Sequence, residues 1–436
     1  MLIPQRRLLA VTGLWTCVAV IAAFVPMARA VWQAMGALLV GAAAADAWLA
    51  RRAPTGLEVR RETPRALSVG LWHTVALTLT ARARAVSGIV LDRMPVGAES
   101  EHDSQSFSVP QGSFARLSYR VRPLQRGNDR IGPLDLRLDS PLGLWHNQQT
   151  IGDATDIRVY PDFARIVHYT WLATDNRLSQ IGVLQRRRRG QGLEFHQLRD
   201  YRQDDSPRQI DWSATARARR LIAREYQDER DQQVVLVLDC GQRMRAKDGA
   251  MSHFDHALNA LLLLAYVALR QGDAVGVGTF AHDRPRFLPP RKSIAMVSAL
   301  MHGLFDLQPS LHTPDYVGAA TALGTRLTKR ALIVIATTVR DEDGDALHEA
   351  ARLLRRKHGV IVANLRESAL TKAKERPIAH LDDALVYAAA TDYLERRRRT
   401  IAMLRRRGVQ IIDVPPAGLA RQLVNHYWDL KRAGAA

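Results

Sequence analysis

The sequence predicts a multi-domain protein built from an N-terminal transmembrane helical hairpin, a small antiparallel β-sandwich and an α/β doubly wound (Rossmann-like) domain. Two long apolar segments near the N-terminus, short alternating runs after them and continuous apolar runs in the C-terminal half predict these parts in turn. The chain has 436 residues, which is too long for one ordinary core. We expect the hairpin at 1–52, the sandwich at 55–165, a charged linker at 166–232 and the α/β domain at 233–432.

Both N-terminal segments are long enough to cross a bilayer. No charged residue occurs from Leu8 to Ala28, and the stretch from Ala30 to Ala50 is interrupted only by Asp46. About 20 apolar residues are needed for a transmembrane helix. A signal peptide and a pair of buried core helices are the alternatives. Two tandem apolar segments without a convincing cleavage site favour a membrane hairpin.

The distribution of arginines predicts the orientation of this hairpin. Its connecting turn contains only one arginine, Arg29, whereas its outer flanks contain Arg6, Arg7, Arg51, Arg52, Arg60 and Arg61. By the positive-inside bias, both ends of the hairpin face the cytoplasm. We therefore expect a protein of the inner (cytoplasmic) membrane whose soluble domains are cytoplasmic.

The alternation of apolar residues changes along the rest of the chain. Runs such as "HTVALTLTA" at 73–81 and "FARLSYRV" at 114–121 have the period of two that is typical of antiparallel strands. From Val234 onward, the apolar runs "VVLVLD", "AVGVGTF", "ALIVIAT", "GVIVANL" and "GVQIIDV" are separated by helical segments. Continuous apolar strands that alternate with helices predict a mostly parallel sheet covered on both faces.

A charged segment, Gly190 to Arg230, connects these two parts. Its charges alternate in sign and predict an internal ion-pair network of Glu194, Arg199, Asp205, Arg208, Asp211 and Arg217. Trp212 lies beside Ile210 in this segment, and we expect its large apolar side chain to be buried at a junction between the sandwich and the α/β domain.

Several motifs together resemble the DUF58 family. They are "RG" at 126–127, "DSPLGLW" at 139–145, "VYP" at 159–161 and the Glu-Phe, Leu-Arg-x-Tyr, Asp-x-x-Arg-x-Ile-Asp-Trp and Ala-Arg pattern of the charged segment. Asp204 departs from the family's usual glycine, but aspartate tolerates left-handed turns. The resemblance implies a von Willebrand factor A-like domain. It also implies a scaffold role beside a MoxR-type AAA+ ATPase and other membrane-complex proteins.

Metal-binding A domains carry Asp-x-Ser-x-Ser after their first strand, and a threonine and a second aspartate from later loops complete the oxygen ligands of Mg²⁺. Here Asp239 retains the first position, but Gly241 and Arg243 replace the serines. Thr313 aligns with the threonine, and Thr337 stands where the second aspartate is expected. We therefore predict a degenerate site that binds no divalent cation and needs no cofactor.

The residues of this degenerate site suggest structural roles instead. We expect Asp239 to cap the following segment or to pair with Arg243, whose guanidinium would replace the ion's charge and meet Asp239 or a partner's carboxylate. The acidic residues Asp341, Asp343 and Asp345 are expected to be solvated.

The sequence favours a non-catalytic interaction protein. It has no Gly-x-Ser-x-Gly motif, Walker loop or histidine cluster at metal spacing. A hydrolase that uses Glu194, Asp205 and Asp211 is one alternative, and nucleic-acid binding is another.

The formal charge of +19 indicates an acidic partner or an anionic surface. Aromatic residues do not interleave with the basic runs at 186–189, 396–399 and 405–407, so solvated surface or anionic lipid is favoured over nucleic acid.

Overall fold

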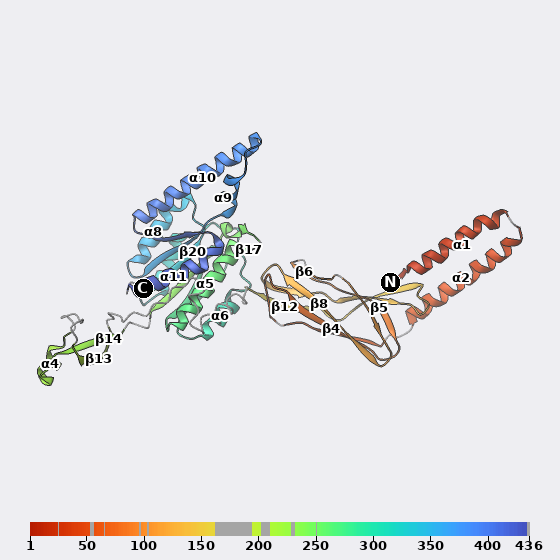
Figure 1. Ribbon diagram of the computed structural model, residues 1–436, viewed down its shortest axis with the longest axis horizontal. Coiled ribbons are helices and arrows are strands. Elements are labelled where there is room, and N and C mark those ends of the chain that lie inside the picture. The colour runs from red at the N-terminus through yellow and green to blue at the C-terminus, as the bar shows by residue number, and fades with distance from the viewer. Residues whose placement is uncertain are drawn as a thin grey trace. The chain divides into compact units, whose positions relative to one another are not determined.

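The computed structural model describes residues 1–24, 26–52, 56–64, 66–95, 97–102, 104–161, 194–201, 210–227, 232–249 and 251–433. The chain divides into two compact units, Met1–Tyr160 and Pro161–Ala436. The first unit contains the helical hairpin and the β-rich part, and the second contains the α/β sheet (Figure 1).

Two apolar helices form the hairpin of the first unit. They are α1 (Arg6–Phe24) and α2 (Pro26–Arg52), and both are long and apolar enough to cross a membrane. The rings of Trp15 and Trp32 stack with their centroids 4.7 Å apart. Each indole N–H also donates to the other residue's carbonyl oxygen, at 3.1 and 3.2 Å. Trp15 and Trp32 therefore join the two helices to each other.

The β-rich part contains two antiparallel sheets that share one core. The five-stranded sheet has the order β1 (Leu2–Pro4), β11 (Trp145–Ile151), β10 (Leu134–Asp139), β5 (Val86–Asp92) and β7 (Gln105–Val109). The four-stranded sheet has the order β2 (Leu57–Glu62), β4 (His73–Ala81), β8 (Ser113–Pro123) and β6 (Ala98–Ser100). Alternate residues of the two sheets, such as Leu77 and Leu79 of β4 and Leu136 and Leu138 of β10, fill the core between them.

A smaller sheet extends this part. It comprises β3 (Ala66–Ser68), β12 (Thr155–Tyr160) and β9 (Gly127–Ile131), with its own cluster of buried residues. Strand β3 is parallel to β12, whereas β9 is antiparallel to it.

The second unit contains a six-stranded mixed sheet. Its order is β19 (Phe287–Arg291), β18 (Ala274–Phe280), β15 (Gln233–Asp239), β20 (Ala331–Thr337), β21 (Gly359–Leu365) and β22 (Gln410–Val414). Five strands are parallel and β19 is antiparallel at the edge. All five apolar runs noted in the sequence form the parallel strands. The sequence did not predict β19, whose two prolines are tolerated because it is an edge strand.

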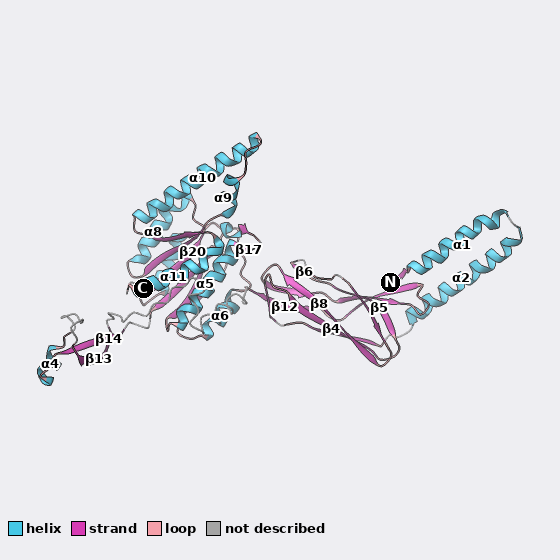
Figure 2. Ribbon diagram, viewed as in Figure 1, coloured by secondary structure: helices cyan, strands magenta, loops and turns pink. Residues whose placement is uncertain are grey.

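Helices cover both faces of this sheet (Figure 2). The helices of the unit's main body are α5 (His253–Arg270), α6 (Ala295–Leu304), α7 (Tyr316–Arg326), α8 (Gly344–Arg355), α9 (Ser368–Glu375), α10 (Leu381–Arg406) and α11 (Leu419–Arg432). Residues of α7, α8 and α10 share one hydrophobic core with β15 and β20. Helix α5 also packs against α11. Strands β13 (Glu194–Asp200) and β14 (Ile222–Gln227) form a separate small antiparallel pair, and the short helix α4 (Trp212–Ala218) lies between them in the sequence.

The strand order reverses direction at the centre of the sheet. Strand β15 pairs with β18 on one side and with β20 on the other. Ligands of open α/β sheets bind outside the carboxyl ends of the strands at such a point. Asp239 ends β15 and Thr337 ends β20, so both residues lie at this position.

Candidate functional site

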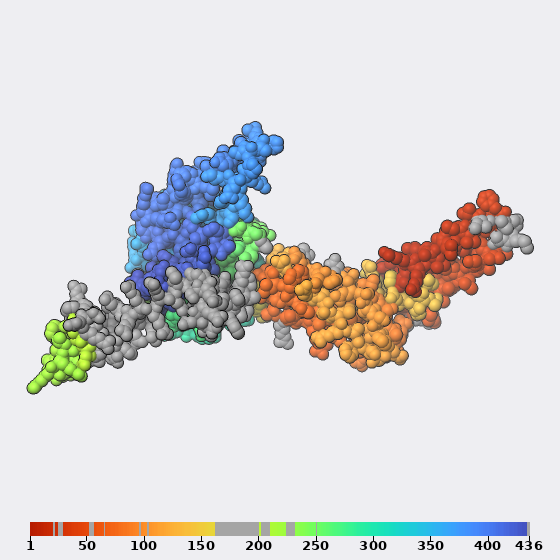
Figure 3. Space-filling model, in the orientation of Figure 1, coloured from red at the N-terminus to blue at the C-terminus, as the bar shows by residue number. Residues whose placement is uncertain are grey.

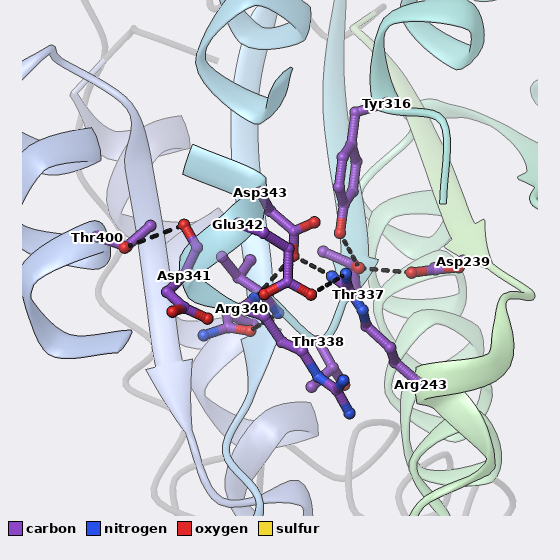
Figure 4. Close-up of polar contacts among 12 residues, drawn as sticks. Asp239, Arg243, Tyr316, Thr337, Thr338, Arg340, Asp341, Glu342, Asp343 and Thr400 are labelled. Carbon is purple, nitrogen blue, oxygen red and sulfur yellow. Dashed lines mark hydrogen bonds and ion pairs between the residues drawn. The ribbon is translucent and has the colours of Figure 1, made fainter. Parts of the chain in front are cut away.

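Asp239 is the centre of a buried polar network at the carboxyl edge of the α/β sheet (Figure 4). Its Oδ1 accepts a hydrogen bond of 2.7 Å from the backbone N–H of Gly241. Its Oδ2 accepts one of 2.6 Å from the Thr337 hydroxyl, which lies 2.9 Å from the Tyr316 hydroxyl. Asp239 therefore bonds to the backbone of the segment after its strand, although Gly241, and not Asp239, is the N-cap of the 3₁₀ turn Gln242–Arg245.

Burial decides the ionisation of this carboxyl group. Desolvation raises the pKa of Asp239 to about 6, although the hydrogen bonds from Thr337 and Gly241 and the charge of Arg243 act in the opposite direction. The same burial raises the pKa of the Tyr316 hydroxyl well above its ordinary value. Asp239 is thus a carboxylate at neutral pH that takes up a proton more readily than an exposed aspartate does.

Arg243 forms the second half of the site. It lies in the short 3₁₀ turn Gln242–Arg245, which begins three residues after Asp239, and its side chain is only 4% exposed. One guanidinium nitrogen donates to the Asp343 carboxylate, and the other donates to Glu342 Oε1 at 2.8 Å. The predicted direct pair with Asp239 is wrong, because the guanidinium turns toward the Asp341–Asp343 turn (Figure 4).

Asp343 also differs from its predicted role. It is buried, and it accepts a 2.8 Å hydrogen bond from the backbone N–H of Arg340 besides its ion pair with Arg243. The prediction that it is solvated is wrong because the turn after β20 points this side chain inward. The burial of this carboxylate is tolerated since a guanidinium and a backbone N–H both compensate its charge.

The residues present do not fit a divalent cation. A Cβ atom on Gly241 would lie 2.8 Å from the carbonyl oxygen of His312 and 3.0 Å from Asp239 Oδ1, so the loop has no room for a serine. Thr313 is exposed, although its loop contacts the first loop through a 2.9 Å bond from the Gln242 N–H to the His312 carbonyl. No group of three His, Cys, Asp or Glu side chains with metal-binding geometry occurs among the described residues.

The burial of Arg243 also restricts how a partner can bind. A guanidinium that is 4% exposed and bonded to two acidic side chains cannot meet a partner's carboxylate without breaking those bonds. The predicted contact with a partner's carboxylate would have to displace these acidic side chains, and it stays a prediction. The groups that a partner can reach are those of the exposed rim, which includes Leu311, His312 and Glu342.

The charged segment before the sheet is only partly described. Asp204, Asp205 and Arg208 lie outside the described residues, and so do the side chains of Glu194 and Arg199 on β13. Neither the ion-pair network nor a hydrolase site that combines these acids is tested. Asp211 is the N-cap of α4 and accepts a 3.0 Å bond from the Ala214 N–H. Arg217 bonds locally to the Ser213 carbonyl and hydroxyl, at 3.3 and 3.2 Å.

Trp212 is exposed within the second unit, and its expected burial at a junction with the sandwich stays a prediction. Its side chain is 68% exposed, because it is the first residue of the seven-residue helix α4, which buries none of its side chains.

The arginine run at 396–399 of α10 is paired within the α/β unit. Arg397 is buried and its guanidinium lies 2.6 Å from Asp413, while Arg396 pairs with Asp392 at 2.9 Å. Arg398 and Arg399 both contact Glu395. The run at 186–189 lies outside the described residues. These pairs reduce the positive charge that α10 offers to a nucleic acid.

A second buried carboxylate lies at the base of the hairpin in the first unit. Asp46 of α2 accepts hydrogen bonds from the Ser140 hydroxyl at 2.5 Å, the Leu142 N–H at 3.0 Å and the Leu144 N–H at 3.2 Å. In addition, the Trp145 indole donates to the Ala43 carbonyl at 2.9 Å. The "DSPLGLW" motif of the sequence thus holds the last turns of α2.

Comparison with known proteins supports the family resemblance. Residues 197–401 match the family described as "Protein of unknown function DUF58". No curated protein matches the chain. The conserved hypothetical protein BatB from Bacteroides thetaiotaomicron is 14% identical, over 46% of this chain and 98% of its own, with a TM-score of 0.30. The CARDB domain of the PF1109 protein from Pyrococcus furiosus, in complex with di-metal ions, is 14% identical, over 24% of this chain and 86% of its own, with a TM-score of 0.18.

Proposed function

We propose that this protein is a membrane-anchored, non-catalytic interaction or scaffold protein that works with a MoxR-type AAA+ ATPase in the assembly or remodelling of membrane complexes. In this proposal the hairpin anchors the chain, and the α/β unit is a von Willebrand factor A-like domain that binds partners. The ATPase and the other membrane-complex proteins are partners that the DUF58 resemblance suggests.

The closed network at the carboxyl edge carries this proposal. The sheet has the strand reversal at which α/β folds bind ligands, yet Asp239 is bonded to Thr337 and Gly241, and Arg243 is bonded to acidic side chains. Side chains that are buried and bonded in this way stabilise the conformation of the loops. Acid or base catalysis would instead need a proton donor or acceptor that a substrate can reach. Binding of a partner protein by the exposed rim around Leu311, His312 and Glu342 is the role that agrees best with this geometry.

Copurification tests the partnership. We expect the full chain, extracted from native membranes in mild detergent, to bring with it an AAA+ ATPase that mass spectrometry identifies. Leu311→Asp, on the exposed rim, should abolish this copurification because it places a charge in the contact surface. The matched control is Ile294→Asp, another exposed apolar position, which lies near the amino edge of the sheet, after β19. Recovery of the ATPase with Leu311→Asp but not with Ile294→Asp would contradict the proposal.

Metal independence is a separate expectation. Titration calorimetry of the full chain with Mg²⁺ or Mn²⁺ at pH 8, where Asp239 is ionised, should show no saturable binding, because Arg243 neutralises the acids that remain near Asp239. A chelator should leave the copurified complex intact. Stoichiometric Mg²⁺ binding that Asp239→Asn abolishes would show that a cation site persists.

Topology is tested by reporter fusions. A reporter active only outside the cytoplasm should give no signal when it is fused to the C-terminus, because arginines on both outer flanks of the hairpin keep these ends inside. The same reporter inserted between Phe24 and Arg29 should be active, since the proposal places that turn outside the cytoplasm. A strong signal from the C-terminal fusion would overturn the proposed location in the inner membrane with cytoplasmic domains.

A further inference from the structure

The loop Ser140–Leu144 of the first unit contacts both helices of the hairpin. It bonds to Asp46 of α2, as described above. On the side of α1, a Cβ atom on Gly143 would lie 2.9 Å from a guanidinium nitrogen of Arg7. The Gln5 amide, just before α1, donates to Asp139 Oδ1 at 2.7 Å and to the Trp145 carbonyl at 3.2 Å. The depth of the hairpin therefore fixes the depth of this loop.

The length of each helix then defines where the bilayer ends. A hydrocarbon core of about 30 Å corresponds to about 20 helical residues at a rise of 1.5 Å each. Counted from Arg29 along α2, this length ends near Trp48. Counted backward from Phe24 along α1, it ends near Gln5. Both helices thus reach the edge of the hydrocarbon close to residues that are bonded to the 139–145 segment, namely Gln5 before α1 and Asp46 of α2.

The side chains around this loop suit a membrane interface. Leu142 is 55% exposed at the tip of the loop, and Trp48 and Leu49 are exposed on the last turns of α2. The side chains of Arg6, Arg7 and Arg51 are also exposed. Tryptophan and arginine are enriched at the level of lipid headgroups, where apolar surface and positive charge are both stabilised.

We propose that the Ser140–Leu144 loop lies in the headgroup layer of the membrane and that Leu142, with Trp48 and Leu49, contacts phospholipid. The arginines at the helix ends hold anionic headgroups around it. In this arrangement Asp46 is a polar anchor at the edge of the hydrocarbon, and the two-sheet part of the first unit begins directly at the lipid surface. The inference rests on the proposed membrane anchoring and adds a second, non-helical lipid contact.

Fluorescence quenching of the full chain in vesicles tests the proposal. In a Cys17→Ala, Cys240→Ala background, the single-cysteine variant Leu142→Cys is labelled with an environment-sensitive dye and reconstituted into phosphatidylcholine and phosphatidylglycerol vesicles. We expect blue-shifted emission, quenching by lipid spin-labelled near the headgroup and protection from aqueous iodide. The matched control is Leu124→Cys, an exposed leucine just beyond the far end of β8, which should be quenched by iodide and not by lipid.

A third labelled position separates the two ways in which the experiment can fail. Leu14→Cys lies in the middle of α1 on an exposed surface and should be quenched by lipid labelled deep in its acyl chains. If Leu14→Cys is quenched by lipid and Leu142→Cys behaves like Leu124→Cys, the hairpin spans the membrane but the loop contact is wrong. If Leu14→Cys is also open to iodide, membrane anchoring itself fails and the inference fails with it.

Discussion

Replacing Arg243 by methionine is expected to lower the free energy of unfolding of the α/β unit by about 3–5 kcal/mol. The methionine fills similar volume, but it leaves the buried Asp343 carboxylate without its guanidinium and removes a positive charge near Asp239. Urea denaturation of the full chain in detergent measures this decrease in the free energy of unfolding, with the protease sensitivity of the α/β unit as the readout.

Arg352→Met is the matched control. Arg352 also makes two hydrogen bonds to a carboxylate, Glu349, at 2.6 and 2.8 Å, but both partners are exposed. An exposed pair of this kind is expected to contribute less than about 1 kcal/mol. The double change Arg243→Met, Asp343→Leu should recover much of the stability, because it removes the buried charge together with its partner. Equal stability of Arg243→Met and Arg352→Met would refute the role assigned to the network.

The main elements of the fold could be predicted because their sequence patterns are strong and local. Five continuous apolar runs marked the parallel strands, and two long apolar segments marked the helices of the hairpin. Elements with weak local signals were missed. Strand β1 has only three residues and forms because it pairs with β11, more than 140 residues later. Strand β19 contains two prolines and forms only as an edge.

The geometry of the candidate site was less predictable because its partners are distant in sequence. Gly241 and Arg243 stand where a metal-binding A domain would have serines, but the sequence did not show that the Arg243 guanidinium turns away from Asp239. Its partner Asp343 is 100 residues away, and three aspartates of similar spacing follow β20. Which of them turns inward depends on the 3₁₀ turn Asp341–Asp343, for which the sequence has no distinctive signal. Tyr316 was missed for the same reason.

The role of Asp46 was missed, although the transmembrane segment that contains it was predicted. An aspartate near the end of an apolar stretch was interpreted only as an interruption, because nothing nearby in the sequence pairs with it. Its donors come from the 140–144 loop, about one hundred residues later. A carboxylate in an apolar helix is costly unless it is paired or hydrogen-bonded, so its presence was itself a signal that a partner must exist.

Replacing Asp46 by alanine is therefore expected to destabilise the first unit by about 3 kcal/mol, since three donors lose their acceptor and each unsatisfied group costs about 1–3 kcal/mol when water cannot replace it. The loss should appear as a lower thermal midpoint of the full chain in detergent. It should also appear as faster hydrogen exchange of the Leu142 and Leu144 amides, which donate to Asp46.

Asp156→Ala is the control for this change. Asp156 pairs with Arg130 at 2.7 Å, but both side chains are exposed, so its loss should leave the thermal midpoint almost unchanged. Asp46→Asn retains one oxygen acceptor, and its effect should lie between those of the other two variants. If Asp46→Ala matches Asp156→Ala in stability and in the exchange of the Leu144 amide, the loop does not depend on Asp46, and the attachment of the hairpin has to come from Trp145 and its neighbours instead.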